Sequence, residues 1–255
     1  MLKIYCLLFL TTLTSFQIEG KSLAPSSELP SLIKSPFKER CQNAKAGDYV
    51  VTHQDHAYSL LFIRKIDSQY LVLEEITVAE NLIDLKKIDW KKWVKEKALG
   101  HTSWTLYKID LAHSTLIEAF SFSKKGWLYL DDTQQLLSKM LSLPFQKLDP
   151  KDQRKIGALP PSSAEDHRPI WTPPLFIEGK KQQKARFDVW EGKWPKDGSA
   201  ASGCAVQIYL NQADPSFLFP HWIEVKSPHY RLKIRSIDSG RGMESIYPEP
   251  EQSPR

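Results

Sequence analysis

The stretch DYVVTHQDHAYSLLFIRKIDSQYLVLEEIT, residues 48–77, contains three strand-like runs separated by two short polar turns. The runs cover 48–53, 57–66 and 69–77, and all are rich in aliphatic, aromatic or β-branched residues. Turns this short join strands that pair in opposite directions. The middle run is apolar on both faces, which is typical of a central strand covered on each side. The stretch therefore predicts an antiparallel meander.

Further strand-like runs follow, with amphipathic segments between them. The expected strands cover 103–110, 115–123, 125–130, 175–178, 184–190 and 204–210, with a hairpin over 221–240. The expected helices cover 79–100, 131–144 and a short segment at 149–157. These elements indicate an α+β fold. We expect a predominantly antiparallel, curved β-sheet, built as a meander or half-barrel, with two or three helices packed on it.

The hairpin stretch HWIEVKSPHYRLKIRSIDSG, residues 221–240, has an apolar face and a basic face. With the turn at 227–228, Glu224 opposes Arg231 on the basic face. A solvated surface is one interpretation of this face. The other is contact with anionic lipid or glycan headgroups, with a tryptophan as the interfacial ring. The surface-binding candidates are Trp222, Lys226, Arg231, Lys233 and Arg235.

The two ends of the chain differ in composition from the middle. Residues 1–20 have the basic start, apolar run and polar end of a secretory signal peptide, which predicts export to the periplasm or the extracellular space. Residues 21–47 are rich in Ser and Pro and are expected to be a lead-in. We expect a single domain over 48–240, with a candidate internal boundary near 158–174, and a disordered Pro-rich tail over 241–255.

The charge and hydropathy limit the partners. The net charge is +5, and it stays at +5 without residues 1–20 because these contain one lysine and one glutamate. This charge is far below that of a dedicated nucleic-acid binder, so no nucleic-acid partner is expected. It is compatible with an anionic membrane surface. No later segment approaches the roughly 18 apolar residues of a membrane span.

Cysteine and histidine positions suggest few metal or redox sites. Cys41 and Cys204 are disulfide candidates in an oxidising compartment, although a buried thiol explains Cys204 equally well. His53, Asp55 and His56 are suitable zinc ligands, but a turn between two strands explains the same residues. We therefore expect no metal and no cofactor.

The chain lacks the usual catalytic motifs: it has no nucleophile elbow, phosphate-binding loop, zinc-protease helix or Cys-x-x-Cys pair. If the protein is a secreted hydrolase of glycan or peptide, the catalytic candidates are Asp188, Glu191 and His221. The neighbouring Trp190 and Trp194 are candidates for a platform that binds an apolar ligand or a carbohydrate. The missing motifs favour a non-enzymatic role.

Together these patterns predict an exported, non-enzymatic envelope protein that carries a lipid, a lipoprotein or another apolar ligand. At the level of the fold alone it is similar to periplasmic carriers of lipoproteins and lipids, and no motif matches them residue by residue. The alternatives are the secreted hydrolase and a purely structural or adhesive protein. A dry apolar cavity favours the carrier, whereas two carboxyls about 5–10 Å apart in an open cleft favour the hydrolase.

Overall fold

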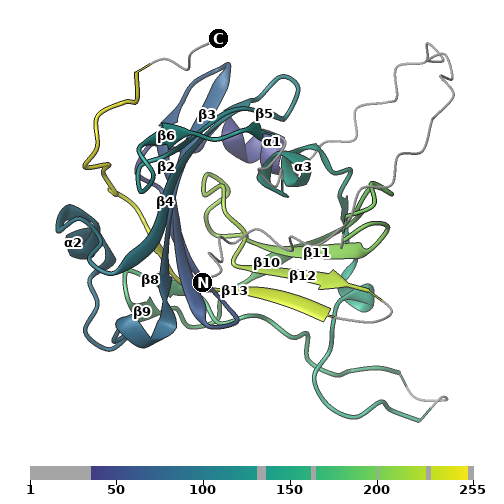
Figure 1. Ribbon diagram of the computed structural model, residues 1–255. Coiled ribbons are helices and arrows are strands. Elements are labelled where there is room, and N and C mark those ends of the chain that lie inside the picture. The colour runs from purple at the N-terminus through teal and green to yellow at the C-terminus, as the bar shows by residue number, and fades with distance from the viewer. Residues whose placement is uncertain (1–35, 131–135, 162–164, 200, 228–230, 252–255) are drawn as a thin grey trace, which may run out of the picture.

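The computed structural model describes residues 36–130, 136–161, 165–199, 201–227 and 231–251. Eleven strands form one antiparallel sheet in the order β6-β5-β4-β3-β2-β1-β13-β12-β11-β10-β7, which is not closed into a barrel (Figure 1). The strands are β1 Tyr49–Gln54, β2 Ala57–Ile66, β3 Tyr70–Ala79, β4 His101–Asp110, β5 Thr115–Ser121, β6 Gly126–Trp127, β7 Gln146–Lys147, β10 Phe187–Lys193, β11 Ala205–Asn211, β12 Trp222–Lys226 and β13 Arg231–Gly240.

The remaining elements are short. The α-helices are α1 Pro36–Cys41, α2 Trp90–Lys95 and α3 Leu136–Ser142. The 3-10 turns are η1 Glu80–Leu82 and η3 Pro150–Asp152, and β8 Phe176–Ile177 pairs with β9 Lys180–Lys181 in a separate hairpin. The expected antiparallel sheet with helices packed on it is confirmed, although the helices are few and small.

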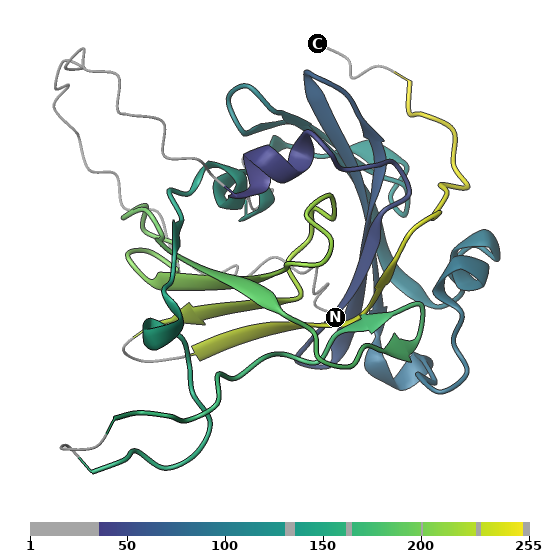
Figure 2. The same cartoon turned by 180° about the vertical axis from the view of Figure 1, so that it is seen from behind.

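The sheet is strongly bent, so that β1–β6 form one wall and β7 with β10–β13 form the other (Figures 1 and 2). The walls meet where β1 pairs with β13, and the register there shifts between Val51 and Thr52. A bulge of this kind bends the sheet locally. Helices α1 and α3 lie on the inner side of the bend, and α2 lies outside the first wall. The inner face holds the largest cluster of buried apolar side chains.

The helix expected over 79–100 is wrong. Within this segment the structure has only η1 and α2, because two aspartates start local turns. Asp84 accepts a hydrogen bond from the backbone N–H of Lys86, and the Asp89 side chain caps α2 by accepting from the N–H of Lys92. Aspartate favours such caps over a helix interior. The helix expected at 149–157 is likewise reduced to η3.

The hairpin of β12 and β13 is confirmed, with a register that differs from the expected one by two residues. Lys226 pairs with Arg231, and Ile223 pairs with Ile234. Because side chains alternate with a period of two, this shift leaves residues 222–226 and 231–235 on their expected faces. Glu224 lies directly opposite Lys233 and forms its ion pair diagonally, with Arg231 at 3.0 Å between Oε1 and Nε.

Three segments near the expected domain limits pack against the sheet. Within the lead-in 21–47, residues 36–41 form α1 and bury Phe37 in the core. Residues 165–174, in the candidate boundary, belong to a crossing segment that packs Trp171 against the outer face of the second wall. Residues 241–251 of the tail lie along the first wall, where the Tyr247 ring stacks on Phe122 at 4.6 Å between centroids.

The tail lies where it does because buried polar groups hold it. Arg64 forms an ion pair with the fully buried Glu74 and donates to the backbone oxygen of Tyr247 at 3.0 Å. Trp104 donates its indole N–H to the same glutamate at 2.7 Å. The expected signal peptide, residues 1–20, lies outside the described residues. Among the helices that the structure describes, none is long and apolar enough to span a membrane.

Candidate functional site: an apolar cavity inside the bend

A cavity of about 100 Å³ lies on the inner face of the bent sheet. Both walls, α1, α3 and the loop before β12 contribute to it. The lining residues are predominantly apolar: Phe37, Val50, Thr52, Ser59, Leu61, Leu71, Leu73, Glu75, Tyr107, Ile109, Leu116, Leu137, Ser138, Met140, Leu141, Leu218, Phe219, Pro220, Ile223 and Ile234.

Alternation along the strands creates the apolar lining. In β3, residues 71, 73 and 75 point into the cavity, and the intervening residues face the outer side. The neighbouring strands place their own alternate residues on the same face because directly opposed residues point to the same side. Both faces of these strands are covered, as the doubly apolar pattern of 57–66 predicts.

Glu75 is the one carboxylate in the cavity lining. It is 5% exposed, and burial raises the pKa of its carboxyl despite two hydrogen bonds that oppose this effect. Ser59 donates to Oε1 at 2.6 Å, and Tyr107 donates to Oε2 at 3.0 Å. The three side chains come from adjacent strands β2, β3 and β4. They form a compact polar group in an apolar wall.

Helix α1 covers the cavity and is fixed by Arg40. This buried guanidinium donates to three backbone oxygens, one at the end of β11 and two in the loop between β11 and β12, at distances of 2.7–3.0 Å. The acceptors belong to Asn211, Asp214 and Phe217. Burial lowers the pKa of Arg40, whereas the nearby Asp188 and Asp214 raise it. The arginine therefore holds α1 against the loop that contributes residues 218–220 to the cavity.

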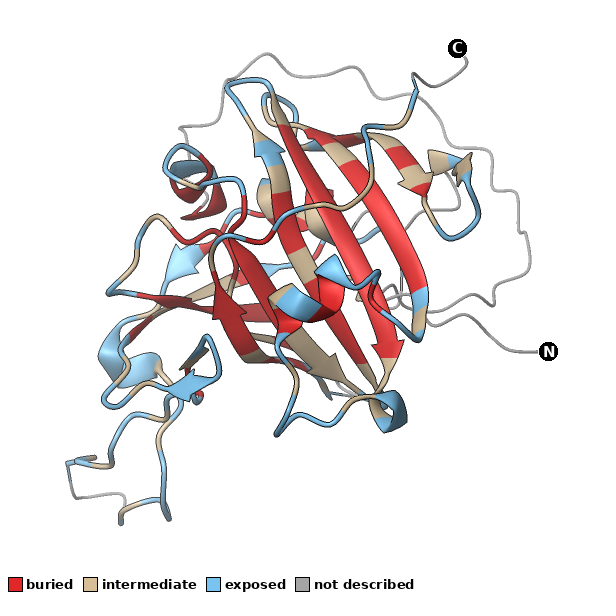
Figure 3. Cartoon of the chain, turned by 90° about the vertical axis from the view of Figure 1, so that its left-hand side faces the viewer, coloured by how far each residue is buried: buried red, intermediate tan, exposed pale blue. Residues whose placement is uncertain are grey.

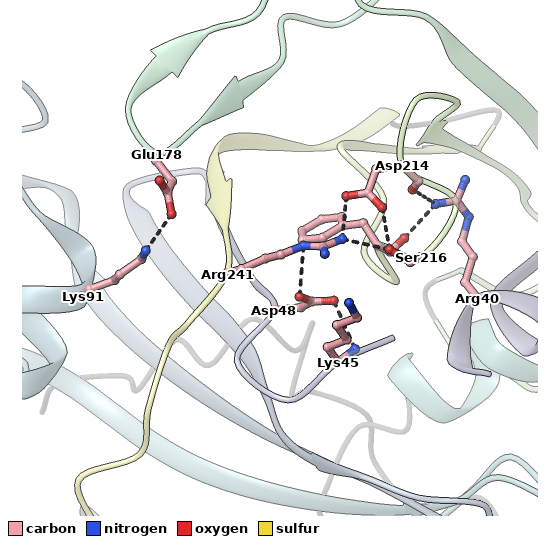
Figure 4. Close-up of polar contacts among 9 residues, drawn as sticks. Arg40, Lys45, Asp48, Lys91, Glu178, Asp214, Ser216 and Arg241 are labelled. Atoms are coloured by element: carbon pink, nitrogen blue, oxygen red, sulfur yellow. Dashed lines mark hydrogen bonds and ion pairs between the residues drawn. The ribbon is translucent and has the colours of Figure 1, made fainter. Parts of the chain in front are cut away.

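A second arginine holds the same loop from the other side (Figure 4). Arg241 follows β13, and its Nη2 lies 2.7 Å from Asp214 Oδ2 and 2.8 Å from Ser216 Oγ. Its Nε lies 3.5 Å from Oδ1 of Asp48, a buried carboxyl just before β1. Burial raises the pKa of Asp48, and Arg241 opposes that shift. Together the two arginines connect the loop to α1 and to the residues that precede β1.

Helix α3 contributes Leu137, Met140 and Leu141 to the cavity. Lys139, on its outer side, forms an ion pair with Asp197 and lies over the Trp194 ring at 5.9 Å. The lysine is one-third exposed. An ion pair at this exposure stabilises the contact only weakly.

The structure does not bring the predicted catalytic residues together. Asp188 and Glu191 both lie on β10, three residues apart, and therefore point to opposite faces of the sheet. Asp188 pairs with Lys147 at 2.7 Å, and Glu191 accepts from Gln207 at 2.6 Å. His221 is 2% exposed and stacks on Phe217, and burial lowers the pKa of its imidazole to about 4.

The structure places the predicted binding tryptophans at different depths. Trp194 is buried in the inner core and donates to Asp197 at 3.2 Å. Trp190 is half-buried against the same core, and Trp222 is half-buried against Trp171 on the other side of the sheet. All three indole rings are therefore at least partly buried. Their burial follows from a sheet that is covered on both faces.

The predicted basic face of the hairpin is outward but partly neutralised. Arg231 pairs with Glu224, and Lys226 donates to Gln207 at 2.8 Å. Lys233 and Arg235 are exposed, and Arg235 donates to Nδ1 of His53 at 3.2 Å. Arg231, Lys226 and Arg235 therefore each have a partner within the protein.

The predicted zinc cluster is a turn. Asp55 has a φ of +51° at the tip of the β1–β2 hairpin, which suits a two-residue turn. His53 and His56 both approach Glu80, with Nε2 and Nδ1 at 3.4 and 3.6 Å from its Oε2. Among the residues that the structure describes, no group of three or more His, Cys, Asp or Glu side chains is arranged so that it could hold a metal ion.

The predicted disulfide is not formed in the structure. Cys41 and Cys204 are free thiols, and both are buried in the inner core. Burial raises the pKa of Cys41 to about 12, which keeps this thiol protonated. Both cysteines therefore pack as small apolar side chains, which is the alternative that the sequence offered for Cys204.

The chain is similar to a known protein family and to a solved structure. Residues 59–183 match the model of a family described as CT021 protein. The chain is similar to the 2.0 Å structure of the hypothetical protein CT021 from Chlamydia trachomatis, with a TM-score of 0.62 and 21% identity. That match covers 85% of this chain and 98% of the other. At this identity the likeness shows the fold alone. A comparison with curated proteins found no match.

Sequence reasoning missed Glu75 and the two arginines. The available signal was the pair Glu74-Glu75 inside the apolar run of β3, because a carboxylate in a doubly covered strand must be buried. Arg40 lay in a segment expected to be a lead-in, and Arg241 in one expected to be disordered. Their roles depend on a loop that is distant from both in the sequence.

Proposed function

We propose that this protein carries an apolar ligand, such as the acyl chain of a lipid or lipoprotein, in the cavity inside the bend. The observation that carries the proposal is the cavity itself, which is lined by both walls, two helices and a loop, with aliphatic and aromatic side chains predominating. Such a lining recognises hydrocarbon by burial of apolar surface rather than by directional bonds.

The size of the cavity indicates how a ligand enters. At about 100 Å³ it is smaller than the roughly 150 Å³ cavity that accommodates benzene, so a long chain requires the covering elements to move outward. Helix α1 is fixed by three hydrogen bonds from Arg40. Helix α3 is tied by the partly exposed ion pair of Lys139 with Asp197, so α3 is the element that we expect to move.

Export and the absence of catalytic motifs support a carrier over an enzyme. The predicted signal peptide directs the chain to an envelope or extracellular compartment, where insoluble acyl chains need a carrier to cross water. The candidate acids Asp188 and Glu191 lie on opposite faces of β10, an arrangement that does not favour the two-carboxyl hydrolase. A purely structural role gives no reason for a cavity.

The test combines native mass spectrometry with binding measurements on a variant whose cavity is filled by a larger side chain. Native mass spectrometry of the protein purified from its own compartment should reveal a bound lipid, which extraction then identifies. Titration with a fluorescent fatty acid should show saturable binding. Ile223→Trp places a large ring in the cavity and should weaken that binding by about tenfold or more.

Ile237→Trp is the matched control. Ile237 is half-buried, as Ile223 is, but it packs in the cluster on the opposite face of the sheet. The control should therefore retain the affinity of the wild-type chain. Equal affinity of both variants, or purified protein without lipid that also fails to bind the fluorescent fatty acid, contradicts the carrier.

A further inference from the structure

The connection between β3 and β4, residues 80–100, has one anchored side and one exposed side. Trp90, Trp93, Val94 and Ala98 are buried against the outer face of the first wall. Figure 3 shows this face, where the strands are mostly buried and much of the connection is exposed. The connection is therefore fixed to the sheet, and the residues on its other side face solvent.

Three leucines lie on the exposed side of the connection. Leu82, Leu85 and Leu99 expose 57, 48 and 83% of their surface. Leu82 lies next to Gly100, the residue after Leu99, because a Cβ built on Gly100 would approach Cδ1 of Leu82 to 3.4 Å. Single exposed leucines are common, but three on one connection give its exposed side an apolar character, and we call these three residues the leucine patch.

The backbone holds Leu99 outward. Lys97 and Ala98 have positive φ values of +64° and +47°, a conformation that non-glycine residues rarely adopt. The buried methyl of Ala98 and a 3.1 Å hydrogen bond from the Trp93 indole to the Leu99 carbonyl oxygen fix this turn. Two successive residues in an unfavourable conformation thus place the side chain of Leu99 in solvent.

Lysines are frequent in the connection and in the segment that contacts it. Residues 80–100 contain six lysines and four acids, and the adjacent residues 177–184 add three lysines and one acid, so the two segments have nine lysines against five acids, a net charge of +4. Lys91 joins the two segments through an ion pair with Glu178 at 2.6 Å (Figure 4). Within the described residues, Lys86, Lys95 and Lys97 are exposed and make no ion pair.

We infer that this leucine patch and its lysines dock on the surface of an anionic lipid bilayer. Leucine side chains enter the boundary between headgroups and acyl chains, and lysines bind acidic headgroups. Charge complementarity selects a membrane over a purely apolar protein groove. The inference concerns the outer face and holds whether or not the inner cavity binds a ligand.

Vesicle sedimentation tests the inference with the full chain. The wild-type protein should sediment with vesicles in which a third of the phosphatidylcholine is replaced by phosphatidylglycerol, and much less with pure phosphatidylcholine. The triple variant Leu82→Ser, Leu85→Ser and Leu99→Ser should bind roughly tenfold more weakly. Leu159→Ser, at an 81% exposed leucine elsewhere, should bind as the wild type does.

A charge series separates the lysines from the leucines. Lys86→Gln, Lys95→Gln and Lys97→Gln together should weaken binding to anionic vesicles, and salt at about 1 M should weaken wild-type binding in the same way. The matching triple Gln variant at the exposed Lys124, Lys125 and Lys151 should not. Because all the substituted side chains are exposed, circular dichroism should show a folded protein in each case. Equal binding of wild type and the serine variant, or equal binding to anionic and neutral vesicles, overturns the inference.

Discussion

The phenol of Tyr107 donates a 3.0 Å hydrogen bond to Glu75 at the wall of the cavity. A carboxyl in this position is shielded from water, and its second oxygen accepts from Ser59. Burial disfavours the charged form more than the two hydroxyls favour it, so the pKa of Glu75 is raised. The apolar cavity therefore contains a carboxyl that loses its proton at a higher pH than an ordinary glutamate does.

Glu75→Gln should change how stability depends on pH. The unfolded carboxyl ionises near pH 4.3, whereas the folded one retains its proton to higher pH. Its contribution to stability is therefore complete below pH 4.3 and is lost as the pH rises through the folded pKa. Glutamine does not titrate, so the variant should gain stability relative to the wild type as the pH rises, by up to about 1.4 kcal/mol per pH unit. Urea denaturation at several pH values measures this difference.

A control for Glu75→Gln is available at the surface. The Glu165 side chain is 84% exposed, so Glu165→Gln makes the same substitution without a buried carboxyl and serves as the control. If Glu75→Gln behaves like this control, or loses stability as the pH rises, the assignment of a raised pKa to Glu75 is wrong.

His221→Phe should have the opposite dependence on pH. Burial lowers the pKa of His221 from 6.5 to about 4, so the neutral ring stabilises the fold above pH 6.5 and this contribution is lost as the pH falls toward 4. Phenylalanine can keep the stacking on Phe217, which lies 5.3 Å away between centroids. The variant should gain on the order of 1.4 kcal/mol per pH unit relative to wild type between these limits. A constant difference in urea denaturation between pH 7 and pH 4.5 would refute this account.

Arg40→Met should destabilise the protein by about 3 kcal/mol, because it leaves three backbone oxygens without their charged donor. Hydrogen exchange should rise in the loop 211–219, which the arginine holds. Lys38→Met on the exposed side of the same helix is the control and should change stability by less than about 0.5 kcal/mol. Equal effects of the two variants would show that Arg40 does not anchor α1.

Features that depend on neighbouring residues could be predicted from the sequence, whereas features that depend on distant residues could not. Strand positions and the two faces of the 221–240 hairpin could be predicted, because alternation depends only on neighbouring residues. The prediction of one helix over 79–100 was wrong because Asp84 and Asp89 form local turns and caps that interrupt it. The cavity could not be predicted, because Thr52, Glu75 and Ile223 meet only through the bend of the sheet.

Gly240→Ala should destabilise the junction of the two walls. Gly240 pairs with Tyr49, and an added Cβ would lie 2.8 Å from the ring and hydroxyl of this buried tyrosine. The tyrosine or the strand must shift, at a cost of about 2 kcal/mol. Gly242→Ala is the comparison, since it has open space and only a positive φ of +77°, which costs about 1 kcal/mol. If Gly242→Ala is the more destabilising change in urea denaturation, close packing of Gly240 against Tyr49 does not determine the stability of the junction.

Photochemical labelling tests the central claim most directly. A fatty acid with a diazirine near the end of its chain should, on irradiation, label peptides that contain cavity residues such as Met140, Leu218 or Leu73. Labelling of these peptides should disappear in Ile223→Trp and persist in Ile237→Trp. Labels confined to the exposed leucines of the β3–β4 connection, or undiminished cavity labelling in Ile223→Trp, would contradict an apolar ligand held inside the bend.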